Sequence, residues 1–254
     1  MPAPSTDPSN HQSAMTAMGK TFHFKKFRVQ QDHCAMKVGT DGVLLGAWTS
    51  LTRNPQSILD IGAGTGLIAL MLAQRSDAGQ VDALEIDQAA SEQCAENFQA
   101  SPWGNRLRCY HTSLQEYVAN TERRYDLIVS NPPFYSETVP GRAANRDLAR
   151  QNRTLPFEAL IAGVGSLLGQ TGRFCAIVPY REESRVRSLA GAYSLFLRRI
   201  TRVKGHPSAP LKRSLLEFSR EDLLPETGSL VIEEGRHQYT ASYRDLTSDF
   251  YLKM

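Results

Sequence analysis

Residues 60–66 read Asp-Ile-Gly-Ala-Gly-Thr-Gly, and this stretch joins the apolar run Ser57–Ile61 to the helical stretch Leu67–Arg75. Glycines let a backbone turn sharply and approach a ligand closely, and the helix that follows presents free N–H groups. A turn that binds a nicotinamide dinucleotide would read G-x-G-x-x-G, but here the third glycine comes one residue early. The stretch therefore predicts a ligand-binding turn between a strand and a helix. Its glycine spacing indicates a ligand that has no pyrophosphate.

Outward from this turn, short apolar runs alternate with helical stretches. The expected strands are Ser57–Ile61, Gln80–Ile86, Arg106–His111, Tyr125–Ser130, Gly172–Pro179, Leu197–Gly205 and Leu211–Ser219, the last two as a hairpin-like pair. The expected helices are Leu67–Arg75, Gln88–Ser101, Phe157–Leu168 and Glu182–Leu195. This alternation predicts a single α/β domain with a Rossmann-like, doubly wound, mostly parallel seven-stranded sheet. Ligands of such sheets bind beyond the carboxyl ends of the strands.

An acidic residue, Glu85, ends the second expected strand. A carboxylate at this position can accept both ribose hydroxyls of an adenosine. Together with Glu85, the compact D-x-G-x-G-x-G turn resembles motif I of class I methyltransferases, in which the turn lies against the methionine part of S-adenosylmethionine. The resemblance implies that the protein binds S-adenosylmethionine. It predicts contacts with this cofactor from Asp60, Gly62, Gly64, Gly66 and Glu85.

The same class often carries an Asp after the third strand, where it contacts the adenine of the cofactor. Here Ser113 occupies that position and Leu114 follows it. The resemblance implies that the Ser113 side chain and the Leu114 backbone N–H replace the missing carboxylate.

The loop after the fourth expected strand reads Asn131-Pro132-Pro133-Phe134. An amine on an aromatic base, or an amide nitrogen, attacks a methyl group poorly because its lone pair is delocalised. The side-chain oxygen of Asn131 and the carbonyl of Pro132 can accept hydrogen bonds from both amine hydrogens and so localise that lone pair. Phe134 offers a flat face for an unstacked base. We predict catalytic roles for Asn131, Pro132 and Phe134, in a loop that resembles the [DN]-P-P-[FYW] motif of amino methyltransferases.

Composition excludes several other classes of protein. The chain has 254 residues, of which 41% are hydrophobic and 22% charged. It has no run of about 18 apolar residues for a membrane span and no secretory signal, so we expect a cytoplasmic protein with residues 1–20 as a disordered leader. Its four cysteines, Cys34, Cys94, Cys109 and Cys175, lack the grouping of a disulfide framework or a zinc site, and we expect no metal.

Charge is distributed unevenly along the chain. Residues 142–213 hold 14 Lys and Arg against 4 Asp and Glu. Such a block is typical either of a positive face for a polyanionic substrate or of a solvated helix surface rich in arginine.

The length of the chain narrows the choice among possible acceptor amines. Enzymes with this loop methylate adenine or cytosine amines of DNA, bases of RNA, or a glutamine amide of protein release factors. The chain has no room for the target-recognition domain of DNA enzymes or the helical domain of release-factor enzymes, and unpaired RNA loop bases need little flipping. RNA is the first hypothesis, and glutamine methylation or another RNA adenine are the alternatives. A tRNA-binding factor with a vestigial site is disfavoured by the intact Asn131 and Glu85.

Three segments resemble the bacterial tRNA(Val) adenine-N6-methyltransferase family. They are the upstream run Phe24–Val29 and Asp32–Trp48, with its stretch Lys37-Val38-Gly39-Thr40-Asp41-Gly42, then Asn131–Phe134, and the closing Tyr239–Lys253, and the glycine turn accompanies them. The resemblance implies methylation of the adenine on the 3′ side of the anticodon, position 37, in a valine tRNA. It also implies a methyltransferase domain over residues 21–254 that begins with a lid segment, residues 21–50.

Within that segment, the resemblance implies that Lys37, Thr40 and Asp41 lie near the amino-acid part of the cofactor. The alternative is that Thr40 or Asp41 caps an apolar helix, Val43–Trp48.

Four arginines follow the catalytic loop at helix-compatible spacing: Arg142, Arg146, Arg150 and Arg153. Because the loop must meet the RNA, we expect these residues to contact phosphates of the tRNA anticodon arm. No obligate protein partner is evident.

Overall fold

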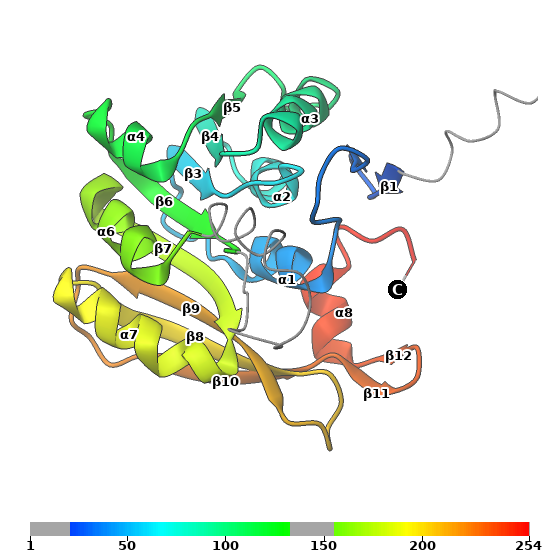
Figure 1. The fold of residues 1–254 in the computed structure, drawn as a ribbon. Coiled ribbons are helices and arrows are strands. Elements are labelled where there is room, and N and C mark those ends of the chain that lie inside the picture. The colour runs from blue at the N-terminus through cyan, green and yellow to red at the C-terminus, as the bar shows by residue number, and fades with distance from the viewer. Residues whose placement is uncertain (1–20, 133–154, 254) are drawn as a thin grey trace, which may run out of the picture.

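The computed structural model describes residues 21–132 and 155–253. Its central sheet is built from β3 (Ser57–Ile61), β4 (Gln80–Glu85), β5 (Leu107–His111), β6 (Tyr125–Ser130), β7 (Leu168–Pro179), β8 (Phe196–Lys204), β9 (Leu211–Ser219) and β10 (Glu226–Val231). The strand order is β10-β8-β9-β7-β6-β3-β4-β5, and only the two pairs that involve β9 are antiparallel (Figure 1). The predicted mostly parallel, doubly wound sheet is confirmed.

Within the described residues the sheet has eight strands, where the sequence predicts seven. The additional strand is β10, which pairs in parallel with β8 from Glu226↔Arg199 to Val231↔Lys204. Leu230 is its one buried residue. A strand at the edge of a sheet with a single buried side chain has no hydrophobic period, so the pattern did not reveal it.

Helices cover both faces of the sheet (Figure 1). One layer holds α1 (Thr40–Trp48), α2 (Leu67–Arg75) and α3 (Gln88–Gln99), and the other holds α4 (Leu114–Ala119), α6 (Phe157–Leu167) and α7 (Glu183–Ala192), the last preceded by the 3-10 turn η1 (Tyr180–Glu182). Successive residues of a strand point to opposite faces. Ile58 accordingly joins the core beneath α1–α3, whereas Leu59 joins the core beneath α4, α6 and α7.

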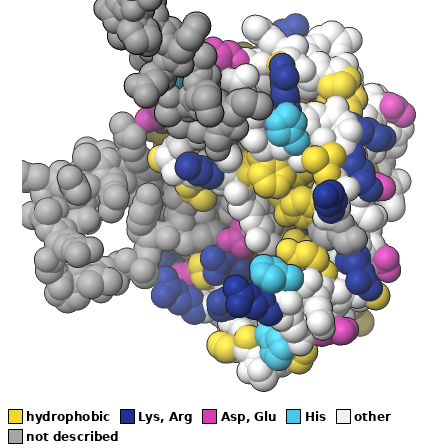
Figure 2. Space-filling view, turned by 90° about the vertical axis from the view of Figure 1, so that its right-hand side faces the viewer, with side chains coloured by type: hydrophobic (Ala, Val, Ile, Leu, Met, Phe, Trp, Pro, Cys, Tyr) yellow, Lys and Arg dark blue, Asp and Glu magenta, His cyan; other side chains and the backbone are white. Residues whose placement is uncertain are grey.

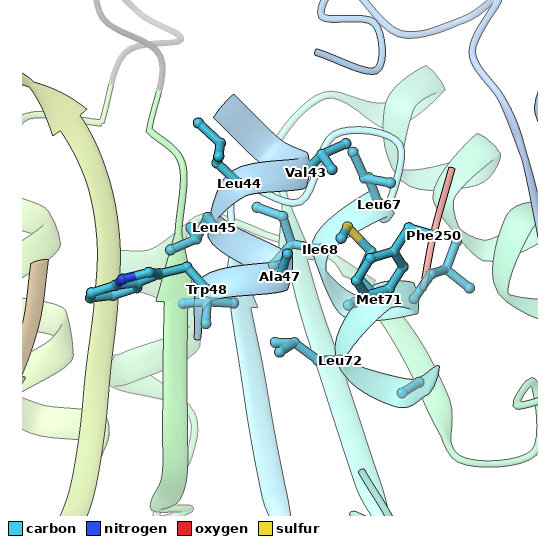
Figure 3. Packing of buried hydrophobic residues seen from close by; sticks show 14 of the residues in the cluster. Val43, Leu44, Leu45, Ala47, Trp48, Leu67, Ile68, Met71, Leu72 and Phe250 are labelled. Carbon is cyan, nitrogen blue, oxygen red and sulfur yellow. The ribbon is translucent and has the colours of Figure 1, made fainter. Parts of the chain in front are cut away.

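The α1 helix belongs to the core. Val43 and Leu45 are fully buried, and Figure 3 shows apolar side chains of α1 and α2 packed together. A Cβ at Gly46 would come within 2.7 Å of the Met71 sulfur, so a glycine is required for this close approach. None of the described helices is long and apolar enough to cross a membrane.

The two ends of the described chain are joined to each other. A hairpin of β1 (Thr21–His23) and β2 (Arg28–Gln30) lies beside the C-terminal segment, which contains β11 (Glu233–Gly235), β12 (Gln238–Tyr239) and α8 (Ala241–Thr247). Phe24 forms an antiparallel bridge with Tyr251, and the Lys25 N–H donates to the Phe250 carbonyl at 2.8 Å. Both segments pack on the α1–α2 layer, since Phe24 and Phe250 share its core.

Candidate active site

A cavity of about 890 Å³ lies at the carboxyl ends of β3, β4 and β6. A cavity of this size fits a ligand of nucleoside dimensions or larger. Its position agrees with the expectation for a doubly wound sheet, because β3 is the strand at which the order of the sheet reverses. The predicted residues that line it are Lys37, Thr40, Asp41, Gly62, Gly64, Glu85, Ser113, Leu114, Asn131 and Pro132.

The glycine turn has two kinds of glycine. Gly62, Gly64 and Gly66 all have positive φ, at 74°, 55° and 78°, a conformation that other residues rarely adopt. A Cβ at Gly62 or Gly64 would meet no protein atom within 4 Å, so at these two positions the backbone borders open space. A Cβ at Gly66 would lie 2.5 Å from the Phe98 ring. Gly66 thus serves the packing of the turn on α3 and does not line the cavity.

Asp60 lies beneath the turn and is fully buried. One carboxylate oxygen accepts from the Ala69 N–H at 3.1 Å, and Oδ1 has no hydrogen-bond partner among the described residues. Burial raises the pKa of Asp60 to about 7, and the bond from Ala69 opposes this rise. Asp60 is not among the residues that line the cavity, so it supports the turn from below.

The Glu85 carboxylate is held by two backbone groups. Its Oε2 accepts from the Gly64 N–H at 2.8 Å, and its Oε1 accepts from the Asp87 N–H at 2.9 Å. Each carboxylate oxygen has two lone pairs. One on each oxygen is therefore available to a ligand, and the side chain is fixed while it lines the cavity.

Ser113 has a structural role at the start of α4. Its side chain accepts from the Glu116 N–H at 3.1 Å and donates to the Glu116 carboxylate at 2.8 Å, and that carboxylate also accepts from the Ser113 N–H. This is a complete capping box. Ser113 lines the cavity, but the O–H donor and one of the two acceptor lone pairs of its hydroxyl are already used.

Asn131 carries a polar atom without a partner. It directly follows β6, whose last residue is anchored by a 2.9 Å bond from the Ser130 hydroxyl to the Ile61 carbonyl. The Asn131 Oδ1 is buried and accepts no hydrogen bond from the described residues, although buried polar atoms are nearly always paired. Asn131 and Pro132 both line the cavity, so this acceptor has a ligand space beside it. Phe134 lies outside the described residues.

The N-terminal wall of the cavity comes from residues 34–42. The α1 helix begins at Thr40, and its N-cap is Gly39, without a side-chain cap bond. The alternative that Thr40 or Asp41 caps a helix starting at Val43 is therefore wrong, since both residues lie inside the first turn.

Asp41 instead pairs with a residue that sequence reasoning missed. The Arg213 guanidinium donates to the Asp41 carboxylate at 2.7 Å, and Arg213 also lines the cavity. No local pattern points to this pair because the two residues are 172 positions apart.

Cys34 lines the cavity as well. Its pKa is raised to about 12, first by burial and then by nearby acidic groups including Glu85. A thiol with this pKa is protonated at neutral pH and is not a nucleophile. All four cysteines are free, and the described residues contain no group of His, Cys, Asp and Glu that could hold a metal ion.

The basic block is partly neutralised within the fold. Ion pairs to carboxylates involve Arg173, Arg181, Arg185, Arg187, Arg199, Arg202 and Arg213. Figure 2 shows Lys and Arg side chains around a stretch of apolar ones on the face that carries α8. Arg142, Arg146, Arg150 and Arg153 lie outside the described residues.

In comparisons with known proteins, the matching family model and two similar proteins are named as methyltransferases. Residues 40–156 match the Methyltransferase small domain family. A tRNA1(Val) (adenine(37)-N6)-methyltransferase of Flavobacterium psychrophilum is 57% identical over 92% of this chain and 100% of its own length. A protein of the same name from Flavobacterium johnsoniae is 55% identical, again over 92% of this chain and 100% of its own length.

Among solved structures, a predicted O-methyltransferase from Agrobacterium tumefaciens superposes with a TM-score of 0.64. The match covers 83% of this chain and 96% of the other, at 19% identity. A putative transferase from Pyrococcus horikoshii matches with a TM-score of 0.55 and 14% identity, over 78% of this chain and 70% of the other. At these identities the likeness concerns the fold, which is that of class I methyltransferases.

Proposed function

The chain belongs to the tRNA1(Val) (adenine(37)-N6)-methyltransferase family, and from this membership and the site we propose the reaction that it catalyses. The protein transfers a methyl group from S-adenosylmethionine to the exocyclic N6 amine of adenine 37 in a valine tRNA. The observation that supports this most directly is the buried Oδ1 of Asn131 beside the cavity, which has no hydrogen-bond partner in the part of the chain that the structure describes. The tRNA substrate also favours a cytoplasmic location.

The residues of the cavity fit S-adenosylmethionine. The open backbone at Gly62 and Gly64 leaves space for a ligand against the turn, and Glu85 offers a fixed carboxylate with free lone pairs for ribose hydroxyls. Leu114, Asp87, Lys37, Thr40 and Asp41 also line the cavity. We assign Leu114 and Asp87 to the adenosine end of the cofactor, and Lys37, Thr40 and Asp41 to its amino-acid end. When bound, this cofactor supplies an activated methyl group on a sulfonium.

The protein's own part in the reaction is to hold and orient the amine. The Asn131 Oδ1 and the Pro132 carbonyl accept the two N6 hydrogens, which moves the nitrogen towards tetrahedral geometry and frees its lone pair for the methyl carbon. Bound S-adenosylmethionine would supply the methyl group by cleavage of its S–C bond, and the amine held by Asn131 and Pro132 would accept that group and release its extra proton to solvent. No side chain has to be deprotonated first, which is consistent with the protonated Cys34.

The decisive experiment identifies the methylated atom. Purified protein is incubated with S-adenosylmethionine and either an unmodified tRNA1(Val) transcript or the same transcript with guanine at position 37, and the nucleosides are analysed by mass spectrometry. We expect N6-methyladenosine from the first transcript and none from the second. Methylation of both transcripts would favour another RNA adenine, and transfer only to a protein release factor would favour glutamine methylation.

The cofactor assignment has a separate test in Glu85→Gln. The amide keeps one oxygen, so one of the two bonds from Gly64 and Asp87 is lost and an NH₂ group faces a backbone donor. We expect the affinity for S-adenosylmethionine, measured by calorimetry, to fall by about tenfold or more. Glu92→Gln on the exposed side of α3 is the control, and equal affinity in the two variants would remove Glu85 from the cofactor site.

A further inference from the structure

Beside the cavity, the ends of β7 and β9 carry an exposed aromatic ring between cations. Tyr180 is 41% exposed, the Arg181 side chain is 60% exposed, and Lys212 is exposed. We propose that these three residues, which we name the acceptor ledge, bind the single-stranded RNA that flanks the methylated adenine. The proposal rests on the proposed function and assigns the surface on which its substrate lies.

The strand registers place the ledge next to the catalytic loop. The pairing of β6 with β7 ends at Ser130↔Ala176, and Asn131 follows. The β7 strand continues for three more residues, to Pro179, and at 3.3 Å per residue it extends roughly 10 Å beyond the end of β6. Tyr180 comes next, so the ledge begins within reach of nucleotides adjacent to a base held at Asn131.

The β9 strand connects the ledge to the cavity. Pro179 pairs with Arg213 in the register of β7 and β9. Arg213 lines the cavity, and Lys212, one residue earlier, is the extra residue of a β-bulge opposite β8 and is exposed. One strand end therefore contributes a residue to the cavity wall and the next residue to the outer surface. An RNA strand that leaves the cavity past Arg213 meets the ledge.

The chemistry of the ledge suits unpaired RNA. An exposed Tyr ring can stack with any base, and adjacent cations can pair with the phosphates. Tyr180 belongs to neither hydrophobic core, so its aromatic ring is not required for packing. This separates Tyr180 from Phe174, which is buried in the core beneath α4, α6 and α7, and from Phe157, which packs against that core.

The surroundings of the ledge retain positive charge. Glu182 lies 3.4 Å from Arg181 and 3.7 Å from Arg185. Glu183 pairs with Arg202 and Arg187, and Glu158 pairs with Arg185. Together with Lys212, five cations face three carboxylates here. The excess attracts a polyanion, and the ion pairs fix the arginines in place.

The test compares RNA binding by ledge variants and a matched control. The probe is a fluorescently labelled RNA hairpin with the sequence of the tRNA1(Val) anticodon arm, titrated at several salt concentrations. The variants are Tyr180→Ala, Tyr180→Phe and the double change Arg181→Ala with Lys212→Ala. The control is Arg124→Ala, just before the start of β6 and so at the opposite end of the strands from the cavity, where the exposed guanidinium donates to the carbonyls of Glu122 and Arg123.

We expect Tyr180→Ala to weaken RNA binding roughly tenfold and Tyr180→Phe to restore most of it, because stacking needs the ring and not the hydroxyl. The double variant should bind the hairpin more weakly than the wild type. Its plot of log affinity against log salt concentration should be less steep, by up to about two in slope. Affinity for S-adenosylmethionine should stay at the wild-type value in all of them, which excludes misfolding. The KM for tRNA should rise while kcat at saturating tRNA changes little.

Failure of the ledge and failure of the proposed function give different results. If the wild type methylates tRNA and the ledge variants bind the hairpin as tightly as Arg124→Ala, the ledge is wrong and the proposed function stands. If the wild type binds the hairpin but methylates no tRNA, the proposed function is wrong, and the effect of Tyr180→Ala on binding still decides the ledge.

Discussion

At the scale of single residues, two buried oxygen atoms, one beside the cavity and one beneath the glycine turn, have no hydrogen-bond partner among residues 21–132 and 155–253. One is the Oδ1 of Asn131, and the other is the Oδ1 of Asp60. An unpaired buried acceptor costs about 1–3 kcal/mol. For Asn131 a ligand donor can remove that cost, because the residue lines the cavity. Asp60 does not line the cavity. Protonation of its buried carboxylate lowers that cost instead, and burial therefore raises its pKa.

The role of Asn131 predicts a large effect of Asn131→Ala on the chemical step. Removal of one preorganised hydrogen-bonding group typically lowers kcat by about 10²–10³. We expect a loss of this size in single-turnover methylation, with unchanged affinity for S-adenosylmethionine. Asn131→Asp keeps an acceptor oxygen at the same place and should retain more activity than alanine. A fully active alanine variant would refute the assigned mechanism.

The raised pKa of Asp60 predicts a pH-dependent stability. The folded protein holds a proton on Asp60 up to pH about 7, whereas the unfolded chain releases it near its ordinary value of 3.8. The folded state therefore binds more protons between these values, and its stability falls as pH rises from about 4 to about 7. The contribution is on the order of 4 kcal/mol for a shift of this size.

Asp60→Asn tests this expectation by urea unfolding at pH 5 and pH 8. The amide does not titrate and keeps an oxygen for the Ala69 N–H. The free energy of unfolding of the variant, relative to that of the wild type, should be higher at pH 8 than at pH 5. Parallel stability curves for the two proteins would show that the Asp60 carboxyl does not titrate in this range.

At the scale of elements, the turn between β3 and α2 has two functions in five residues. Gly62 and Gly64 border the cavity and Gly66 contacts α3, yet all three share the left-handed conformation. The turn is attached to β4 as well, because the N–H groups of Gly62 and Ala63 donate to the Leu84 carbonyl. The Glu85 side chain bonds to Gly64, so the turn and the end of β4 form one rigid unit.

This division predicts opposite phenotypes for two alanine substitutions. Gly66→Ala places a Cβ 2.5 Å from the Phe98 ring at φ 78° and should destabilise the fold by about 2–4 kcal/mol. Gly64→Ala meets no protein atom within 4 Å and should cost only about 1 kcal/mol. Its methyl group, however, enters the cavity and should lower the affinity for S-adenosylmethionine at least tenfold. Urea unfolding and calorimetry on both variants measure the two effects, and identical profiles would contradict the division.

At the scale of the whole molecule, the wall of the cavity depends on contacts between distant parts of the chain. The segment before α1 is held to α3 by bonds of Gln93 and Asn97 to the backbone of His33 and Gln30. The N-terminal hairpin is in turn joined to the C-terminal segment at Lys25 and Phe250. Phe250 packs among the side chains of α1 and α2 (Figure 3).

Phe250 is therefore expected to stabilise the whole fold from the end of the chain. It is 1% exposed, and a buried Phe→Ala change costs about 3–5 kcal/mol. We expect Phe250→Ala to lower the free energy of unfolding by that amount in urea titration. Leu252→Ala is the matched control, because Leu252 is 59% exposed and should change stability by less than about 0.5 kcal/mol. Equal stability of the two variants would show that the C-terminal segment contributes little.

The parallel sheet, the glycine turn and the places of Glu85 and Asn131 at strand ends could be predicted from the sequence, because each is a local pattern of apolar period or strand-end residues. Features that depend on distant partners required the folded structure. These are the edge strand β10, the burial of Asp60 and the ion pair of Asp41 with Arg213 on the cavity wall. The hydrophobic period of a strand can be read along the chain, but the partner of a charged group depends on which surfaces packing brings together.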